Sequence, residues 1–210
     1  KYFTFEPWPR LKHADVTKQY GTDKPDLRKN KADVNELAFA WVVDFPLFTE
    51  QSKEDFFHGS GQSKWAPSHH MFTRPKEEDV PLLDTEPGKA RAYQHDLVLN
   101  GLEVGGGSLR IHNPKVQEKV WDLIGFSAEQ KAQFAHLIEA FSYGVPPHGG
   151  IAPGLDRLVS ILCGEKNIRE VIAFPLTGDV RDPLMGAPSE VTKEQLDELG
   201  IMLSKNSLHN

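Results

Sequence analysis

The feature that most constrains the fold is the segment Asp96–Val104 (DLVLNGLEV), in which an Asn-Gly pair separates two short apolar stretches. Asn-Gly favours the left-handed backbone of a two-residue turn, so the pattern predicts a β-hairpin that turns at Asn100-Gly101. The predicted cross-strand pairs are Leu99 with Leu102, Val98 with Glu103, and Leu97 with Val104. Because side chains alternate between the two faces of a strand, Asp96 and Glu103 are expected to share one face.

Three other runs predict further strands. Phe39–Phe45 (FAWVVDF) is short, mostly apolar and bounded by Pro46, which is typical of a buried strand. Ile151–Gly154 (IAPG) predicts a strand that leads into a helix over Leu155–Cys163, and Glu170–Phe174 (EVIAF) is the last strand candidate.

Three further helices are marked by their ends. An N-cap residue followed by proline opens the first, and Ser or Thr with Gln three residues later, the pattern of a capping box, opens the other two. The caps are Asn113, Ser127 and Thr192, and the glycines that end the first and last of these helices are Gly125 and Gly200. The apolar residues expected to face inward from the second helix are Phe134, Leu137, Ile138 and Phe141.

Two segments are interpreted as surface loops: Gln51–Gly61 (QSKEDFFHGSG) and Pro75–Gly88, which is rich in proline and acidic residues. Strands and helices are mixed along the chain, and at least one hairpin is present. This pattern predicts an α+β fold in which helices flank an antiparallel sheet.

Composition narrows the class of protein. A formal net charge of −6 argues against a nucleic-acid-binding module that works by bulk electrostatics. The single cysteine, Cys163, excludes a disulfide framework and favours a cytoplasmic location. No apolar run approaches the ~20 residues of a membrane span, so we expect no membrane partner.

Asp96 and Glu103 are candidate metal ligands. Their backbones lie diagonally across the hairpin, roughly 7–8 Å apart, so both side chains can reach one ligand. Two converging carboxylates can hold Mg²⁺ when phosphate oxygens complete its coordination shell. On spacing alone, two solvated acids on an exposed sheet face remain the alternative.

Three glycines, Gly105–Gly107, precede Arg110 by a few residues. Glycines in a strand indicate that the backbone bends or that another group packs directly on it. Strict alternation would set Arg110 on the face opposite to Glu103, whereas a bulge within Gly105–Gly107 would return it to the Glu103 face. Arginine suits bidentate recognition of a planar carboxylate, and a structural arginine paired with an acid is the alternative.

His69-His70 and Gly149–Arg157 (GGIAPGLDR) are two further candidate segments. Adjacent strand residues point to opposite sides, so the histidines are not expected to bind zinc; a substrate contact and a structural role both remain open. Small residues let a flat ligand lie against the backbone, and Arg157 at a helix start suits phosphate. A Gly-rich turn before a core helix is the alternative, and the sequence contains no P-loop.

Seven blocks, taken together and in order, resemble bacterial and mitochondrial aspartyl-tRNA synthetases, which are class II enzymes. The resemblance extends over residues 9–203, with spacings like those of the family. The blocks are YGTDKPDLR (Tyr20–Arg28), WVVDFPLF (Trp41–Phe48), HHMFT (His69–Thr73), DLVLNGLEVGGGSLRIHN (Asp96–Asn113), YGVPPHGGIAPGLDRL (Tyr143–Leu158), NIREVIAFP (Asn167–Pro175) and GAPSEV (Gly186–Val191).

The resemblance implies roles for individual residues. Arg110 would bind the side-chain carboxylate of aspartate, and His69 would contact the amino acid, with His70 close by. Glu103 would contact ATP and, with Asp96, hold Mg²⁺. Gly154–Arg157 (Gly154, Leu155, Asp156 and Arg157) would correspond to the third signature motif of the family. In that motif the arginine contacts the terminal phosphates of a bent ATP. The residues implied in catalysis are Glu103 and Arg157.

The implied activity is that of an aspartate–tRNA ligase that uses ATP and Mg²⁺. L-Aspartate attacks the α-phosphate of ATP to give aspartyl-adenylate, and the 3′-terminal adenosine of tRNA-Asp then takes the aspartyl group. Catalysis would rest on positioning and electrostatics. A homodimer is expected for the complete enzyme, and whether tRNA-Asn is also charged stays open. The alternatives are a binding or regulatory protein with the same fold and a sibling enzyme that activates another amino acid.

Residues 1–210 are expected to form the C-terminal portion of a class II catalytic domain. The family's OB-fold, its first two motifs and the insertion domain after KPDLR have no counterpart in this sequence. Met71 stands where the family usually has proline, and Leu176 where it usually has lysine. Because the missing second motif carries an ATP-contacting arginine, we expect the isolated chain to have negligible aminoacylation activity.

Overall fold

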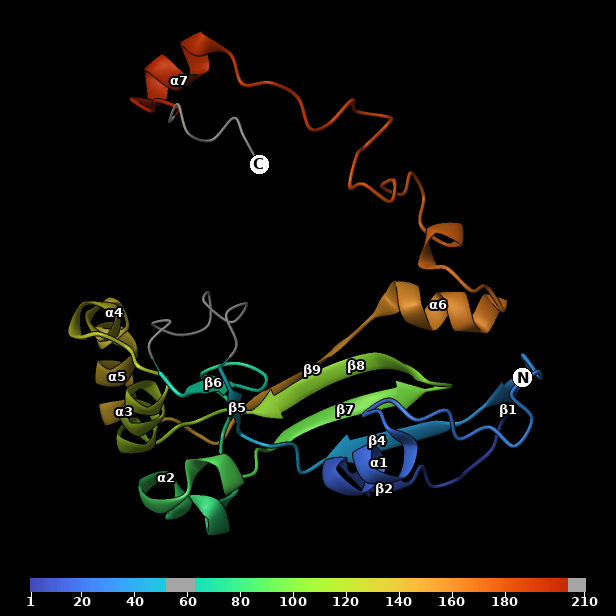
Figure 1. Cartoon of the computed structure of the whole chain (residues 1–210), viewed down its shortest axis with the longest axis horizontal. Coiled ribbons are helices and arrows are strands. Elements are labelled where there is room, and N and C mark those ends of the chain that lie inside the picture. Colours follow the sequence, from blue (N-terminus) through green and yellow to red (C-terminus); the bar gives the residue numbers. More distant parts are fainter. Residues whose placement is uncertain (52–62, 204–210) are drawn as a thin grey trace. The chain divides into compact units, whose positions relative to one another are not determined.

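The computed structural model describes residues 1–51 and 63–203 (Figure 1). The chain forms two compact units, Lys1–Lys166 and Asn167–Asn210. Within the described residues, no helix combines the length and the apolar character that a membrane crossing requires. All the residues proposed from the sequence as site residues belong to the first unit.

The first unit is built on a five-stranded sheet with the order β2-β4-β7-β8-β9. β2 and β4 pair in parallel, and every later pair is antiparallel. The strands are β2 (Arg10–Lys12), β4 (Phe39–Val43), β7 (Gln94–Leu99), β8 (Leu102–Leu109) and β9 (Gly149–Pro153). Two small sheets pair β1 (Tyr2–Phe3) with β3 (Glu36–Leu37) and β5 (Phe48–Glu50) with β6 (Trp65–Pro67).

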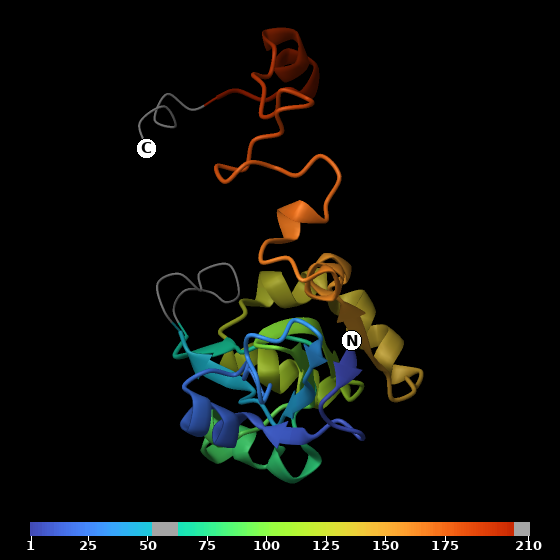
Figure 2. The same cartoon turned by 90° about the vertical axis from the view of Figure 1, so that its right-hand side faces the viewer.

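Helices flank this sheet, which confirms the predicted α+β fold. Helix α1 (His13–Tyr20) lies beside β2 and β4 (Figures 1 and 2), and α3 (Pro114–Leu123), α4 (Ala128–Gln133) and α5 (Ala135–Ser142) lie together beyond the end of the sheet that is next to β5 and β6 (Figure 1). The predicted strand Phe39–Phe45 is present as β4. The predicted strand and helix over residues 151–163 are present as β9 and α6 (Leu155–Cys163).

The β7–β8 hairpin turns at Asn100 and Gly101, whose φ angles are 51° and 87°, as the Asn-Gly pair predicts. The predicted pairs Leu99–Leu102 and Val98–Glu103 are confirmed. The third predicted pair is wrong, because Leu97 pairs with Gly105 and the register skips Val104.

Asn100 also fixes the hairpin to its neighbours. Its Oδ1 accepts a hydrogen bond from the Ala38 amide, and its Nδ2 donates one to the Glu36 carbonyl, both at 2.9 Å. Ala38 and Glu36 lie at the start of the neighbouring strand region, and both are buried. The turn that positions Glu103 is therefore anchored at its tip as well as along its strands.

Helices α3 (Pro114–Leu123), α4 (Ala128–Gln133) and α5 (Ala135–Ser142) begin and pack largely as their sequences predict. The Asn113 side chain caps α3, and both hydrogen bonds of the Ser127–Gln130 capping box are formed. The second predicted helix is divided in two at Phe134. Phe134 and Ile138 pack against the buried Trp121 cluster as expected. All four of the residues predicted to face inward are half-buried.

Helix α6 covers the sheet at the hairpin end. Its Leu158 and Ile161 pack against a cluster that contains Leu99 and Val104. The predicted phosphate-binding segment therefore enters α6 directly from the edge strand β9, which pairs with β8. This connection brings the start of α6 next to the strand that carries Glu103.

Pro75–Gly88 is not a simple surface loop, so this prediction is wrong. It forms short helical turns: η2 (Glu77–Asp79), α2 (Leu82–Thr85) and the start of η3 (Pro87–Lys89). Leu83 is buried there, and Asp79 accepts hydrogen bonds from Arg91, so the segment is anchored by contacts that its composition does not reveal. The other predicted loop, residues 51–61, lies outside the described residues except for Gln51.

The second unit contains η4 (Ile168–Glu170) and α7 (Lys193–Leu199) among its described residues. The capping box at Thr192 and the terminal Gly200 of α7 are confirmed. The predicted strand Glu170–Phe174 is wrong, since residues 167–203 contain no strand. Strand backbone needs a paired neighbour, and here Phe174 adopts a φ of 56°, which breaks an extended run.

Candidate functional site

Asp96 and Glu103 converge on one face of the hairpin, as the turn predicts. The space between them lies over Gly106. A Cβ added to Gly106 would lie 2.8 Å from Glu103 Oε1 and 3.3 Å from Asp96 Oδ1. Glycine at this position therefore leaves open a small cradle that is bounded by two carboxylates.

The electrostatics of this pair favour a cation. Burial, and then the negative charge of Glu103, raise the pKa of Asp96 to about 6. The only hydrogen bond found to the Asp96 carboxylate among the described residues is from Gln94 Nε2, at 3.4 Å. A cation in the cradle would offset both unfavourable effects, so the donor set fits a hard divalent ion such as Mg²⁺. The described residues form no cluster of three or more His, Cys, Asp or Glu that could hold a metal, and waters or substrate oxygens would complete the shell of an ion held by these two carboxylates.

The skipped residue Val104 changes which side chains face the cradle. Gly106 pairs with Asp96 and lies on the carboxylate face, so Ser108 and Arg110 follow on that face by alternation. Both side chains reach the same histidine ring, that of His70, which supports this placement. The predicted return of Arg110 to the Glu103 face is therefore confirmed.

The position predicted for the bulge is wrong, because the register skips Val104 and not a residue within Gly105–Gly107. The glycines serve close approach instead. Gly106 makes room for the carboxylates, and a Cβ on Gly107 would collide with the Gly150 carbonyl of β9. The Gly-rich run thus lets the next strand and the acidic side chains come close to the backbone.

Arg110 and the two histidines form a second cluster on this face. The Arg110 guanidinium contacts the His70 ring, with Nη1 3.0 Å from Nδ1. The His70 ring also lies within 3.3 Å of Ser108 Oγ, and the Phe72 amide donates to its Nδ1 at 3.2 Å. Burial, and then the charge of Arg110, lower the pKa of His70 to about 4, so this imidazole is neutral at neutral pH and can accept from the guanidinium.

The predicted divergence of His69 and His70 is wrong. Their ring centroids are 4.4 Å apart, because the pair lies in a bend after β6 and not in a strand. His69 is the more exposed of the two, and its pKa is lowered by burial and then by Arg110. Of the two rings, it is His70 that contacts Arg110.

An apolar cavity of about 430 Å³ opens beside Arg110. Leu137 and Phe141 of α5, both half-buried, line it. The other residues that line it are Phe72, Ile111 and His148. Arg110 therefore lies between a polar cluster and an apolar wall.

Arg157 projects from the first turn of α6 toward Glu103. Its Nη1 donates to the Glu103 carbonyl at 3.0 Å and lies 4.0 Å from Glu103 Oε2. The Gly154 amide donates to the Val104 carbonyl at 2.8 Å, which fixes the start of the helix to β8. Leu155 and Asp156 are exposed on that first turn.

Sequence reasoning missed Lys24, whose Nζ lies 3.6 Å from Glu103 Oε2. Lys24 belongs to the block Tyr20–Arg28, but no local pattern predicts that this block reaches the hairpin. The structure therefore groups Asp96, Glu103, Lys24 and Arg157 at one end of the face, and Arg110 with the two histidines in a second cluster.

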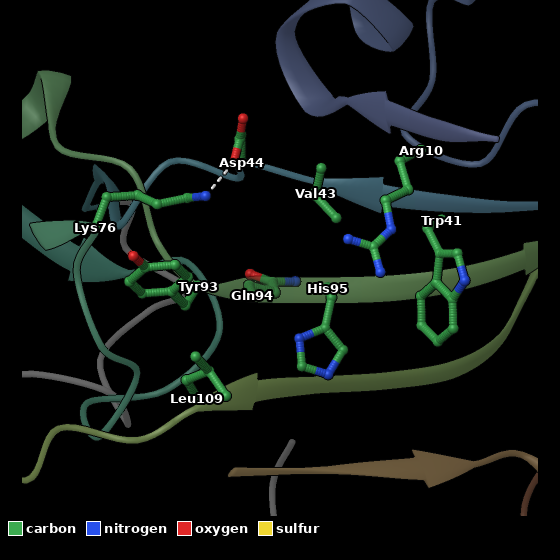
Figure 3. Close-up of a pocket in the computed structure, with 9 residues that line it drawn as sticks. All are labelled: Arg10, Trp41, Val43, Asp44, Lys76, Tyr93, Gln94, His95 and Leu109. Atoms are coloured by element: carbon green, nitrogen blue, oxygen red, sulfur yellow. Dashed lines mark ion pairs between the residues drawn. The ribbon is translucent and has the colours of Figure 1, made fainter. Parts of the chain in front are cut away.

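A separate pocket of about 420 Å³ contains Trp41, Tyr93, His95, Arg10 and Lys76 (Figure 3). Lys76 pairs with Asp44 at 2.6 Å and lies over the Tyr93 ring. The strand register sets Trp41 and His95 on the face opposite to Asp96. This pocket is therefore not part of the carboxylate site.

Comparison with known proteins identifies the family of the chain. Residues 3–178 match the family described as tRNA synthetases class II (D, K and N). The chain belongs to this class II tRNA synthetase family. An aspartate–tRNA ligase of Listeria welshimeri is 50% identical over 181 residues, which are 86% of this chain and 29% of that protein. An aspartate–tRNA(Asp/Asn) ligase of Rubrobacter xylanophilus is 51% identical over 177 residues, 84% of this chain and 28% of that protein.

The class II fold is also found among solved structures. An aspartyl-tRNA synthetase from Entamoeba histolytica superposes with a TM-score of 0.57 at 22% identity, covering 87% of this chain and 34% of its own. An asparaginyl-tRNA synthetase from Entamoeba histolytica, in complex with asparaginyl-adenylate, superposes with a TM-score of 0.55 at 21% identity. The superposition covers 85% of this chain and 38% of that chain. At these identities the likeness establishes the fold. The chain spans less than a third of the length of the curated relatives described above.

Proposed function

We propose that this chain is the part of an aspartate–tRNA ligase that binds ATP and L-aspartate to form aspartyl-adenylate. The observation that carries the proposal is the shared face of the β7–β8 hairpin, where the Asp96–Glu103 pair and Arg110 lie together. The resemblance to curated aspartate–tRNA ligases at about half identity supports it. The partners proposed with it are tRNA-Asp, with tRNA-Asn left open, and a second copy in a homodimer; the expected location is the cytoplasm.

In the proposed reaction, a carboxylate oxygen of aspartate attacks the α-phosphorus of ATP. A new carboxyl–phosphate bond forms, the bond to the β-phosphate oxygen breaks, and pyrophosphate leaves. A hydroxyl of the terminal tRNA adenosine then attacks the aspartyl carbonyl carbon, and AMP leaves. No side-chain nucleophile takes part, so the protein contributes position and charge.

Each site residue has a proposed task in this scheme. Arg157, with Gly154, Leu155 and Asp156 beside it at the start of α6, faces the terminal phosphates. Asp96 and Glu103 hold Mg²⁺, which supplies positive charge against the phosphate oxygens when it is bound. Arg110 binds the side-chain carboxylate of aspartate while neutral His70 orients its guanidinium, and His69 contacts the amino acid from the more exposed side.

The test is amino-acid-dependent exchange of pyrophosphate into ATP, measured on the complete protein with aspartate and with asparagine. We expect exchange with aspartate and at most a trace with asparagine, because the asparagine amide presents a donor to a cationic guanidinium. Exchange with asparagine but not aspartate would identify a sibling enzyme. ATP binding without any exchange would favour a binding or regulatory protein.

A further inference from the structure

Two cations reach the same oxygen of Glu103 from distant parts of the chain. Within the described residues, Lys24 Nζ lies 3.6 Å from Glu103 Oε2, and Arg157 Nη1 lies 4.0 Å from it. The charge of Lys24 also acts on Asp96, where it opposes the rise in the pKa of that carboxyl. Lys24 therefore lies against Glu103 and acts electrostatically on Asp96.

The backbone of Lys24 is fixed against the hairpin. Its amide donates to Thr22 Oγ1 at 3.2 Å, and the next residue, Pro25, is fully buried. Asp26 and Arg28 form a bidentate ion pair, with distances of 2.7 and 3.0 Å. Asp26 Cβ lies only 3.4 Å from the position that a Cβ on Gly101 would take, so the segment packs on the hairpin turn.

The side chain of Lys24 has more freedom than its backbone, since it is 40% exposed. A flexible four-carbon chain with a compact ammonium can exchange one negative partner for another at little cost. With Lys24 and Arg157 the two acids are matched by two cations. Before a metal ion binds, loss of Lys24 would leave two carboxylates facing one cation, and it would weaken the attraction of this end of the face for a triphosphate.

We propose that Lys24 binds the triphosphate of ATP as a second cation beside Arg157. This role rests on the proposed function. Before the nucleotide binds, the ammonium is paired with Glu103. When ATP binds, its phosphate oxygens offer the ammonium a denser negative charge than a single carboxylate does, and the side chain turns to them while its backbone stays on the hairpin.

The test is calorimetric titration of the complete protein with ATP and with adenosine, which has no phosphate. The variants are Lys24→Met, Lys24→Arg and the control Lys18→Met, which removes the same charge from an exposed position in α1. We expect Lys24→Met to bind ATP about tenfold more weakly and adenosine as the parent does. Lys24→Arg should keep most of the ATP affinity, and Lys18→Met should match the parent.

Three results would overturn the assignment. Parent-like ATP affinity in Lys24→Met would leave Lys24 as a counter-ion of Glu103 only. Equal losses for ATP and adenosine would mean that the substitution distorts the site as a whole. If the parent itself failed to bind ATP, the proposed function would be wrong, and the role of Lys24 with it.

Discussion

Gly106→Ala tests the cradle with the smallest possible change. The added Cβ would lie 2.8 Å from Glu103 Oε1 and 3.3 Å from Asp96 Oδ1. Ordinary contacts between heavy atoms are about 3.5 Å, so the Glu103 carboxylate must move by roughly half an ångström or more. Its side chain is long and partly exposed, so the fold accommodates the move, but the two carboxylates no longer converge.

Loss of convergence should weaken metal binding more than it weakens the fold. Mg²⁺ requires near-ideal octahedral geometry with short metal–oxygen distances, so displaced ligands bind it poorly. Perturbations of groups next to a metal ligand typically cost about 10–100-fold in affinity, and we expect a loss in this range. The backbone φ of Gly106 lies outside the left-handed region, so alanine adds no strain there.

The assay is Mn²⁺ binding to the complete protein, followed by electron paramagnetic resonance with a non-hydrolysable ATP analogue present, together with thermal unfolding. Gly178→Ala is the control, because its added Cβ would meet nothing within 4 Å. The reasoning would be refuted if Gly106→Ala bound Mn²⁺ as tightly as the parent. A large fall in Tm with unchanged metal affinity would refute it as well.

Three further predictions follow from the same geometry. Arg110→Leu should abolish useful aspartate activation and leave ATP affinity near the parent value, because losing a buried charge partner costs about 2–5 kcal/mol. A rate of pyrophosphate exchange within a few-fold of the parent rate would make Arg110 merely structural. The pKa of His70 is lowered in the folded chain, so between pH 6.5 and 4 the unfolded chain takes up a proton that the folded chain does not. The free energy of unfolding, measured by urea titration, should therefore fall by roughly 1–3 kcal/mol over this pH range. The fall should be smaller in His70→Gln. Asn100→Ala removes two hydrogen bonds and leaves the buried Ala38 amide unpaired. Chemical denaturation should therefore show a free energy of unfolding that is lower by about 2–3 kcal/mol. Asn100→Asp keeps the acceptor for that amide and should lose less stability.

Local signals in the sequence predicted the elements that position the site. The Asn100-Gly101 pair determined the turn, and alternation from that turn set Asp96 and Glu103 on one face. Caps at Asn113, Ser127 and Thr192 gave correct helix starts, because a capping side chain bonds to amides within its own turn. These features depend on residues that are close in sequence, so they can be predicted before the three-dimensional structure is known.

Features that depend on distant neighbours were not predictable in the same way. The skip at Val104 falls just before the part of β8 that pairs with both β7 and β9, and no motif marks it. The chain bends after β6, which brings the two histidine rings side by side. This bend ends at Thr73, which forms an antiparallel β-bridge with Arg110. The approach of Lys24 to Glu103 depends on the packing of a segment almost eighty residues away in sequence, and only the resemblance to a family block hinted that the segment matters.

The central claim is that one face of the β7–β8 hairpin binds both substrates. The most direct measurement is a crystal structure of the complete protein with a non-hydrolysable aspartyl-adenylate analogue. The account predicts the side-chain carboxylate of the analogue on Arg110 and its adenylate phosphate on the same face, toward the end where Glu103 and Arg157 lie. An analogue bound on the opposite face, in the pocket of Trp41 and His95, would contradict it.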